Sequence, residues 1–137
     1  MAYIDCHLIP VPAGKKPAYL ALASRLNPVL RAYGALRVVE CWGDALAVDP
    51  DTYHASAASG AVKEAAPGMV RGFLAAAGAQ PGETVVFSWV EWPDKATRDA
   101  GTRQAMQDPR MQPVAGEETV FDGRRMVSGG FQALFEG

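Results

Sequence analysis

The 137-residue sequence predicts one α+β domain whose elements follow the order β-α-β-(insert)-β-α-β. Three observations support this prediction. Four segments have the composition or period of strands, two have apolar residues at helical spacing, and an alanine-rich stretch separates the second strand from the third. This order is the split βαβ, or ferredoxin-like, arrangement, with the first strand between the third and fourth and the second beyond the third.

The first strand is predicted at residues 3–9, where polar and apolar side chains alternate. Pro10 and Pro12 are expected to end it, because proline cannot donate a hydrogen bond to a neighbouring strand. The alternation separates an apolar row from a second row on the opposite face, which consists of Tyr3, Asp5 and His7.

The first helix is predicted at residues 15–33, where apolar side chains recur every three or four positions. Pro17 suits the first turn, and Gly34 is the expected C-terminal stop. Pro28 removes one backbone hydrogen bond inside the helix, so a kink is expected there.

The remaining elements follow from composition and capping. A near-continuous apolar third strand implies a central position in the sheet, and Asp94 is the expected N-cap of the second helix. Gly129-Gly130 predicts a bulge or a close backbone approach in the last strand. The predicted elements are strands at 35–43, 83–92 and 125–135 and a helix at 95–107.

Residues 44–82 are expected to form a partly helical insert within the single domain predicted for 1–137, with a short helix at 68–77. Alanine, glycine and proline dominate this stretch, which cannot fill a core of its own.

Composition excludes several classes of function. The formal net charge is −2 and no basic stripe occurs, so nucleic acid and acidic membranes are not expected partners. The N-terminus lacks a targeting pattern, and no apolar run approaches the roughly 20 residues of a membrane span. Cys6 and Cys41 lie in strands separated by a third strand, which favours free thiols and a cytoplasmic location.

The predicted sheet has one face too apolar to remain in water. Two helices cover only one face of a four-stranded sheet. The other face is expected to carry Tyr3, Val38, Trp42 and one apolar row of the third strand, either Val85/Phe87/Trp89 or Val86/Val90/Trp92. A homodimer that encloses a lumen would cover this face. The alternative is that residues 44–82 fold over it.

Segments at both ends of the chain carry a resemblance to a known family. They are 3–5, 8–12, 34–36, 39–41, 43–44, 83–89, 108–111, 121–126 and 129–131, with Tyr19, Pro93, Lys95, Arg98 and Asp99. In this combination the sequence resembles the YbaA-like family, small bacterial proteins of unknown function in the dimeric α+β barrel superfamily. Residues 44–82 are expected to be longer than in the family, and Pro28 is atypical. The resemblance implies a barrel dimer but no substrate or catalytic residue.

Asp5, His7 and Glu40 are the candidate catalytic residues. Asp5 and His7 are two apart on one strand and therefore point the same way, which is expected to be into the lumen, where a carboxylate beside an imidazole can act as a general base. Glu40 has the parity to join them. The alternative is that these polar groups satisfy one another or a partner subunit. The candidate ligand-binding residues are Tyr3, Trp42, Ser88 and Trp89.

Other kinds of site have less support. A metal would need Asp5, His7 and Glu40 to converge, and no metal or cofactor is expected. Charged residues at 108–111 and 122–125 are expected to form structural ion pairs.

Two hypotheses of function follow, and they leave open whether the protein is an enzyme. In the first, the lumen binds a small aromatic or apolar molecule, with oxygenase- or isomerase-like chemistry. In the second, the protein is a non-catalytic dimer that carries a ligand or binds a partner.

Overall fold

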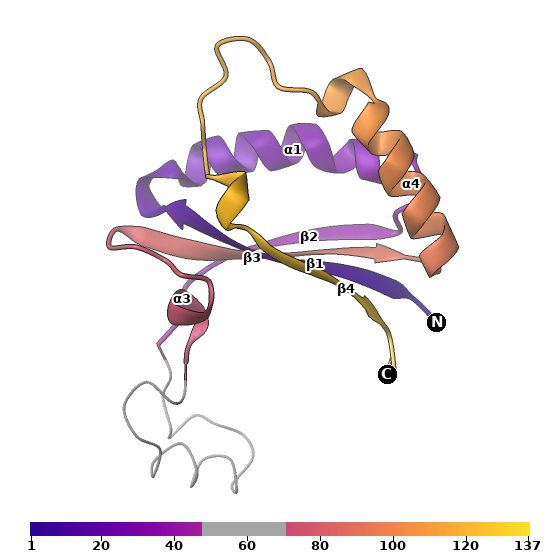
Figure 1. Cartoon of the computed structure of the whole chain (residues 1–137), viewed down its shortest axis with the longest axis horizontal. Coiled ribbons are helices and arrows are strands. Elements are labelled where there is room, and N and C mark those ends of the chain that lie inside the picture. The colour runs from indigo at the N-terminus through magenta and orange to yellow at the C-terminus, as the bar shows by residue number, and fades with distance from the viewer. Residues whose placement is uncertain (48–70) are drawn as a thin grey trace, which may run out of the picture.

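The computed structural model describes residues 1–47 and 71–137. Figure 1 shows a four-stranded sheet with two long helices across one of its faces. The strands are β1 (Tyr3–Pro12), β2 (Arg37–Trp42), β3 (Glu83–Trp92) and β4 (Val127–Gln132). The α-helices of the described residues are α1 (Lys16–Ala32), α3 (Phe73–Ala76) and α4 (Lys95–Gln107), and single 3₁₀ turns lie at Ala13–Lys15, Pro109–Met111 and Gly123–Arg125.

The strand order is β2-β3-β1-β4, and all neighbouring strands are antiparallel. The predicted order is therefore confirmed, as are the bounds of β3 and α4. Asp94 caps α4 as predicted, because the backbone N–H of Thr97 donates to its Oδ1 at 2.7 Å.

β1 continues through the two prolines that were expected to end it. Pro10 pairs with Val85 and Pro12 with Glu83 on β3. On the other side β4 pairs only as far as Leu8, so beyond that residue β1 has a neighbour on one side only. A proline on an unpaired edge forfeits no ladder hydrogen bond, which is why the strand continues.

α1 also runs past Pro28 without ending, and Pro17 occupies its first turn as predicted. The chain leaves the helix through Gly34, whose φ of +111° confirms the glycine stop. Of the helix predicted at 68–77, the described residues form only the four-residue α3. Residues 48–70, which include most of the predicted insert, lie outside the described residues.

The hydrophobic core lies between the sheet and the pair α1 and α4 (Figure 1). We call this side of the sheet the covered face and the other side the open face. One core cluster contains Ile9, Val11, Tyr19, Ala23, Val86 and Val120, and the other contains Tyr3, Ala35, Val90 and Trp92.

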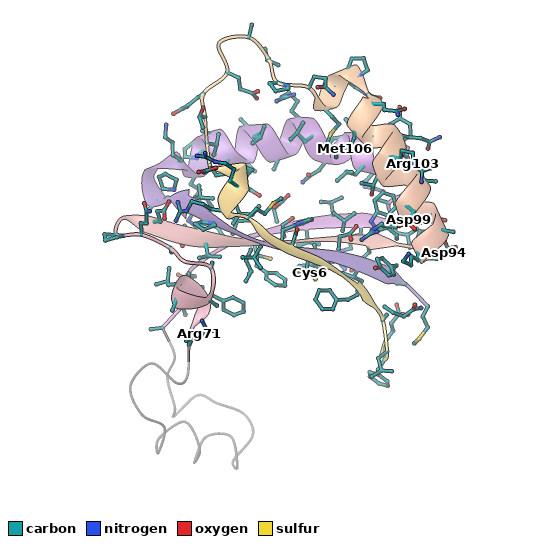
Figure 2. All side chains as sticks on the ribbon, in the orientation of Figure 1. Cys6, Arg71, Asp94, Asp99, Arg103 and Met106 are labelled. Atoms are coloured by element: carbon teal, nitrogen blue, oxygen red, sulfur yellow. The ribbon has the colours of Figure 1, made fainter. Side chains whose placement is uncertain are left out.

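The predicted assignment of rows to faces is wrong for β1 and β2. Tyr3, Val38 and Trp42 pack in or against the core on the covered face. The open face carries the other β1 row, and Figure 2 shows Cys6 on the side away from α1 and α4. Alternation separates two rows but does not say which row the helices cover. On β3, the row on the open face is Val85/Phe87/Trp89, which is one of the two apolar rows that the sequence left open for this strand.

An ion pair fastens α4 to the covered face. Arg98 on α4 approaches Asp5 on β1 with Nη2 2.8 Å from Oδ1, and Trp92 Nε1 donates to Asp5 Oδ2 at 3.0 Å. The Arg98 guanidinium also lies 4.9 Å from the centre of the Tyr3 ring. Asp5 holds the pKa of Arg98 above its ordinary value, so the guanidinium stays charged.

The Gly129-Gly130 pair makes a close approach rather than a bulge. The β1–β4 register is unbroken through both residues. A Cβ on Gly130 would lie 2.4 Å from Tyr3 Oη and 2.7 Å from Arg98 Nη2. Neither group can easily move away, because Tyr3 is buried and Arg98 is held by Asp5.

The two cysteines are free, and β3 lies between their strands as predicted. None of the described helices combines the length and apolar character needed to cross a bilayer.

Gly130→Ala is expected to lower the free energy of unfolding by about 1–3 kcal/mol, because the new methyl group would displace Tyr3 or Arg98. Gly129→Ala is the matched control. Its methyl group would meet only the Phe131 ring, at 3.6 Å, so a change below about 0.5 kcal/mol is expected. Urea unfolding measures both variants, and equal losses would contradict the close approach.

Candidate functional site

A row of polar residues crosses the sheet on the covered face, one from each strand. The register pairs Glu40 on β2 with Ser88 on β3, Ser88 with His7 on β1, and His7 with Ser128 on β4. We call these four residues the polar row. Residues paired across antiparallel strands project from the same face, so all four lie on the covered face. Glu40, Ser88 and His7 line a hollow beneath α1, whereas Ser128 on the edge strand is exposed.

Glu40 is held by two neutral donors from α1. Tyr19 Oη donates to Oε2 at 2.7 Å, and Asn27 Nδ2 donates to Oε1 at 3.2 Å. Tyr19 is buried, and burial together with the adjacent Glu40 raises the pKa of its phenol well above the ordinary value. The phenol therefore stays protonated and donates to the carboxylate.

His7 carries a hydrogen-bonding atom that no described residue satisfies. Its Nδ1 is buried and has no partner among the described residues. Burial lowers the pKa of the imidazole, although Asp5 and Glu40 both act in the opposite direction. The ring is therefore neutral near pH 7 and can accept or donate one hydrogen bond to a ligand.

Two hollows flank this part of the sheet. The outer cleft, of about 920 Å³, runs between α1 and the edge strand β2 and includes Trp42 in its wall. The inner pocket, of about 250 Å³, lies under α1 and is lined by His7 and Ser88. Both hollows share five lining residues: Tyr19, Ala23, Asn27, Val38 and Glu40. Glu40 and its donors thus stand between the cleft and the pocket.

The connection from α4 to β4 closes part of the inner pocket. Phe121 lines the pocket and packs on Tyr19 with ring centres 6.1 Å apart. Two ion pairs hold the preceding loop: Lys15, in the turn just before α1, pairs with Glu118, and Arg25 on α1 pairs with Glu117. The pocket is therefore bounded by the sheet, by α1 and by the connection from α4 to β4.

The structure places the three predicted catalytic residues in two different environments. His7 and Glu40 line the inner pocket. Asp5 instead binds Arg98 and Trp92, so it has no role in orienting His7. The expectation that these side chains point away from the helices into a lumen is wrong, because their contacts are with residues of α1 and α4 or with pockets beneath α1.

The predicted ligand-binding residues are divided as well. Trp42 borders the outer cleft and Ser88 the inner pocket. Tyr3 packs beneath Arg98 in the second core cluster. Trp89 lies on the opposite, open face, where its Nε1 donates to Glu91 at 3.1 Å.

Sequence analysis missed Tyr19 and Asn27 as polar components of the site. Tyr19 falls on the apolar stripe of the predicted first helix, which accounts for its ring but not for its hydroxyl. A signal for Asn27 does exist, because it lies four residues after Ala23 and three before Leu30 on that same stripe. An amide on an apolar helix face needs a buried partner, and Glu40 is that partner.

The charged turns form local ion pairs. Asp108 and Arg110 are 2.8 Å apart, and Asp122 and Arg124 are 3.0 Å apart. Asp108 also accepts a hydrogen bond from Tyr33 at 2.8 Å, which ties the end of α4 to α1. Within residues 1–47 and 71–137, no three His, Cys, Asp or Glu side chains are grouped closely enough to hold a metal ion.

Comparisons with known proteins agree with one another. A family described as "Protein of unknown function (DUF1428)" matches residues 2–123. The uncharacterized protein YbaA of Escherichia coli strain K12 is 40% identical over 136 residues, which is 99% of each chain. Uncharacterized YbaA of Shigella flexneri shows the same identity and coverage. Because both matches span nearly whole chains, the expectation that residues 44–82 are longer than in relatives is wrong for these two.

His7 is expected to make the protein less stable in acid. In the folded protein the pKa of the His7 imidazole lies below the ordinary value of 6.5. As the pH falls past 6.5, the unfolded chain therefore takes up a proton at His7 before the folded protein does. The free energy of unfolding decreases over this range until the pH reaches the folded-state pKa. Wild type should therefore lose more unfolding free energy between pH 7.5 and pH 5 than His7→Gln. Asp5 and Glu40 are present in both proteins, so their effects largely cancel. Imidazole resonances that titrate at or above pH 6.5 would contradict this account.

Proposed function

The chain belongs to the YbaA-like DUF1428 family of proteins of unknown function, and we propose that it binds a small molecule in the outer cleft and inner pocket. The observation that supports the proposal most is that His7 Nδ1, which has no partner among the described residues, lines the same largely apolar pocket as the Glu40 carboxylate. Few convergent polar groups on apolar walls are typical of ligand sites.

The dimensions of the two hollows suit this role. The outer cleft falls within the roughly 300–1,000 Å³ of ordinary ligand pockets. An apolar cavity of about 150 Å³ is enough for benzene, and the inner pocket exceeds that volume. A ligand with one aromatic ring could therefore occupy the inner pocket and extend past Glu40 into the cleft.

Proton transfer is the second candidate function, in an oxygenase- or isomerase-like step on the bound molecule. A neutral imidazole and a carboxylate line the same pocket, which favours a general base. Asp5 has no part in this mechanism, because its carboxylate is paired with the Arg98 guanidinium. Once a substrate is found, His7→Gln should abolish turnover while the ligand still binds. Undiminished turnover would rule out His7 as the general base.

We further propose that a second copy covers the open face, so that two ferredoxin-like halves form a dimeric α+β barrel. The open face carries large apolar side chains, among them Phe131 at 57% and Val127 at 49% exposure. The C-terminal segment descends on this same side (Figure 1), and it exposes Leu134 and Phe135 almost fully. Monomers rarely leave so continuous an apolar patch in water.

The two free thiols also support the proposal that the protein works in the reducing cytoplasm.

Ser24→Trp is expected to abolish ligand binding, because the indole would fill the outer cleft that Ser24 lines. Ala21→Trp is the matched control, since Ala21 is equally exposed on α1 but does not line the cleft. Two-dimensional NMR with a library of small aromatic fragments measures both. We expect perturbed amides at Tyr19, Asn27 and Glu40 in wild type and in Ala21→Trp only. Shifts confined to the open face would refute the site.

Phe131→Glu is expected to produce a monomer of 14.5 kDa, whereas wild type sediments at twice that mass at micromolar concentration. The control is Met106→Glu on α4, where a side chain of similar exposure, 53%, lies on the helical side (Figure 2). This variant should remain dimeric. Wild type sedimenting as a single chain would rule out the dimer without affecting the cleft.

A further inference from the structure

We infer that the ligand carries a positive charge next to an apolar body, as a small arylamine or alkylamine does. This inference rests on the proposed binding function and names the chemical class that the site selects. It follows from the charges on the sheet, the neutral state of the surrounding donors and the walls of the pocket.

Glu40 is the exception among the carboxylates of the sheet. Asp5 pairs with Arg98 at 2.8 Å, Glu83 with Arg125 at 2.7 Å, and Glu91 lies 4.0 Å from Arg37. Glu40 is the fourth carboxylate in the strands, and no Lys or Arg of the described residues forms an ion pair with it. A carboxylate at a helix–sheet interface is strongly stabilised by a cation, and here the described residues supply none.

The groups around Glu40 cannot take the place of that cation. Tyr19 and Asn27 are neutral donors. His7 could become cationic, but its burial lowers the pKa of the imidazole and keeps it neutral near pH 7. A negative charge therefore persists between the outer cleft and the inner pocket, and an ammonium group is its natural complement.

The walls of both hollows suit the rest of such a ligand. Leucine, valine, methionine and phenylalanine side chains predominate in the inner pocket. Tyr19 and Trp42, with ring centres 6.2 Å apart, adjoin Glu40, and aromatic faces attract cations. A protonated amine that reaches Glu40 therefore also meets rings favourable to its charge.

The cleft's own cations lie at its rim. Lys16 and Arg31 line the outer cleft from opposite ends of α1, and both are exposed. Lys16 rests over the Trp42 ring at 6.0 Å. Solvent and salt screen exposed charges over about 10 Å, so these two weaken the attraction at Glu40 only slightly. With these two cations at the rim, we expect anionic ligands to bind at the mouth of the cleft and not in the inner pocket.

The experiment compares benzylamine, benzyl alcohol and benzoate, which share one ring and differ in charge, by NMR titration at pH 7. We expect benzylamine to bind about tenfold more tightly than benzyl alcohol, because hydrogen bonds between charged groups are the stronger ones. Benzoate should perturb Lys16 or Arg31 but not Ser88. Equal affinities for amine and alcohol, or tighter binding of benzoate in the inner pocket, would overturn the inference while leaving small-molecule binding intact.

Glu40→Gln keeps the shape of the side chain, removes its charge and replaces one acceptor oxygen by an NH2 donor, from which the Tyr19 hydroxyl can accept. This variant should lose the preference for amine, so that benzylamine and benzyl alcohol bind it with affinities within about twofold of each other. Lys16→Gln should keep the preference. If Glu40→Gln fails to fold, the three-ligand comparison on wild type still decides the matter. If none of the three ligands binds wild type at millimolar concentration, both the inference and the proposed function fail.

Discussion

The packing of the helices on the sheet, and the charge left beneath them, depend on how two carboxylates on the covered face are neutralised. Asp5 receives a guanidinium from α4 and an indole N–H from β3, and this contact fixes α4, β1 and β3 to one another. Glu40 receives only a phenol and an amide from α1. The first carboxylate is therefore part of the framework, whereas the second keeps a charge that a ligand can meet. That asymmetry separates a structural ion pair from the proposed binding site on the same surface.

The two faces of the sheet have different proposed roles. Beneath the helices, the polar row ends in an edge strand and opens into the outer cleft, which gives the proposed ligand a path to Glu40 and His7. The open face is largely apolar, and a hollow of about 360 Å³ on it is lined by Phe87 and Phe131. Covering this face with a second copy would leave the cleft accessible. The proposed assembly and the proposed ligand binding would therefore be separable, and a variant could disturb one without the other.

Much of the fold could be predicted because local rules determine it. The bounds of β3 and α4, the Asp94 cap and the strand order follow from composition, spacing and topology. The faces could not be predicted, since alternation along β1 is equally consistent with either row facing the helices. His7 and Glu40 were recognised by chemistry and parity, but their partners Tyr19 and Asn27 lie on α1. Only the packed structure shows that α1 brings a phenol and an amide to one carboxylate while α4 brings an arginine to the other.

The most direct test is a crystal structure of the protein soaked with a mixture of small aromatic amines and alcohols. The account predicts ordered ligand density between α1 and the sheet, with an amine nitrogen within hydrogen-bonding distance of Glu40 and the ring beside His7. Density found only against Phe87 and Phe131 on the open face would contradict it. So would an inner pocket closed by the chain's own side chains.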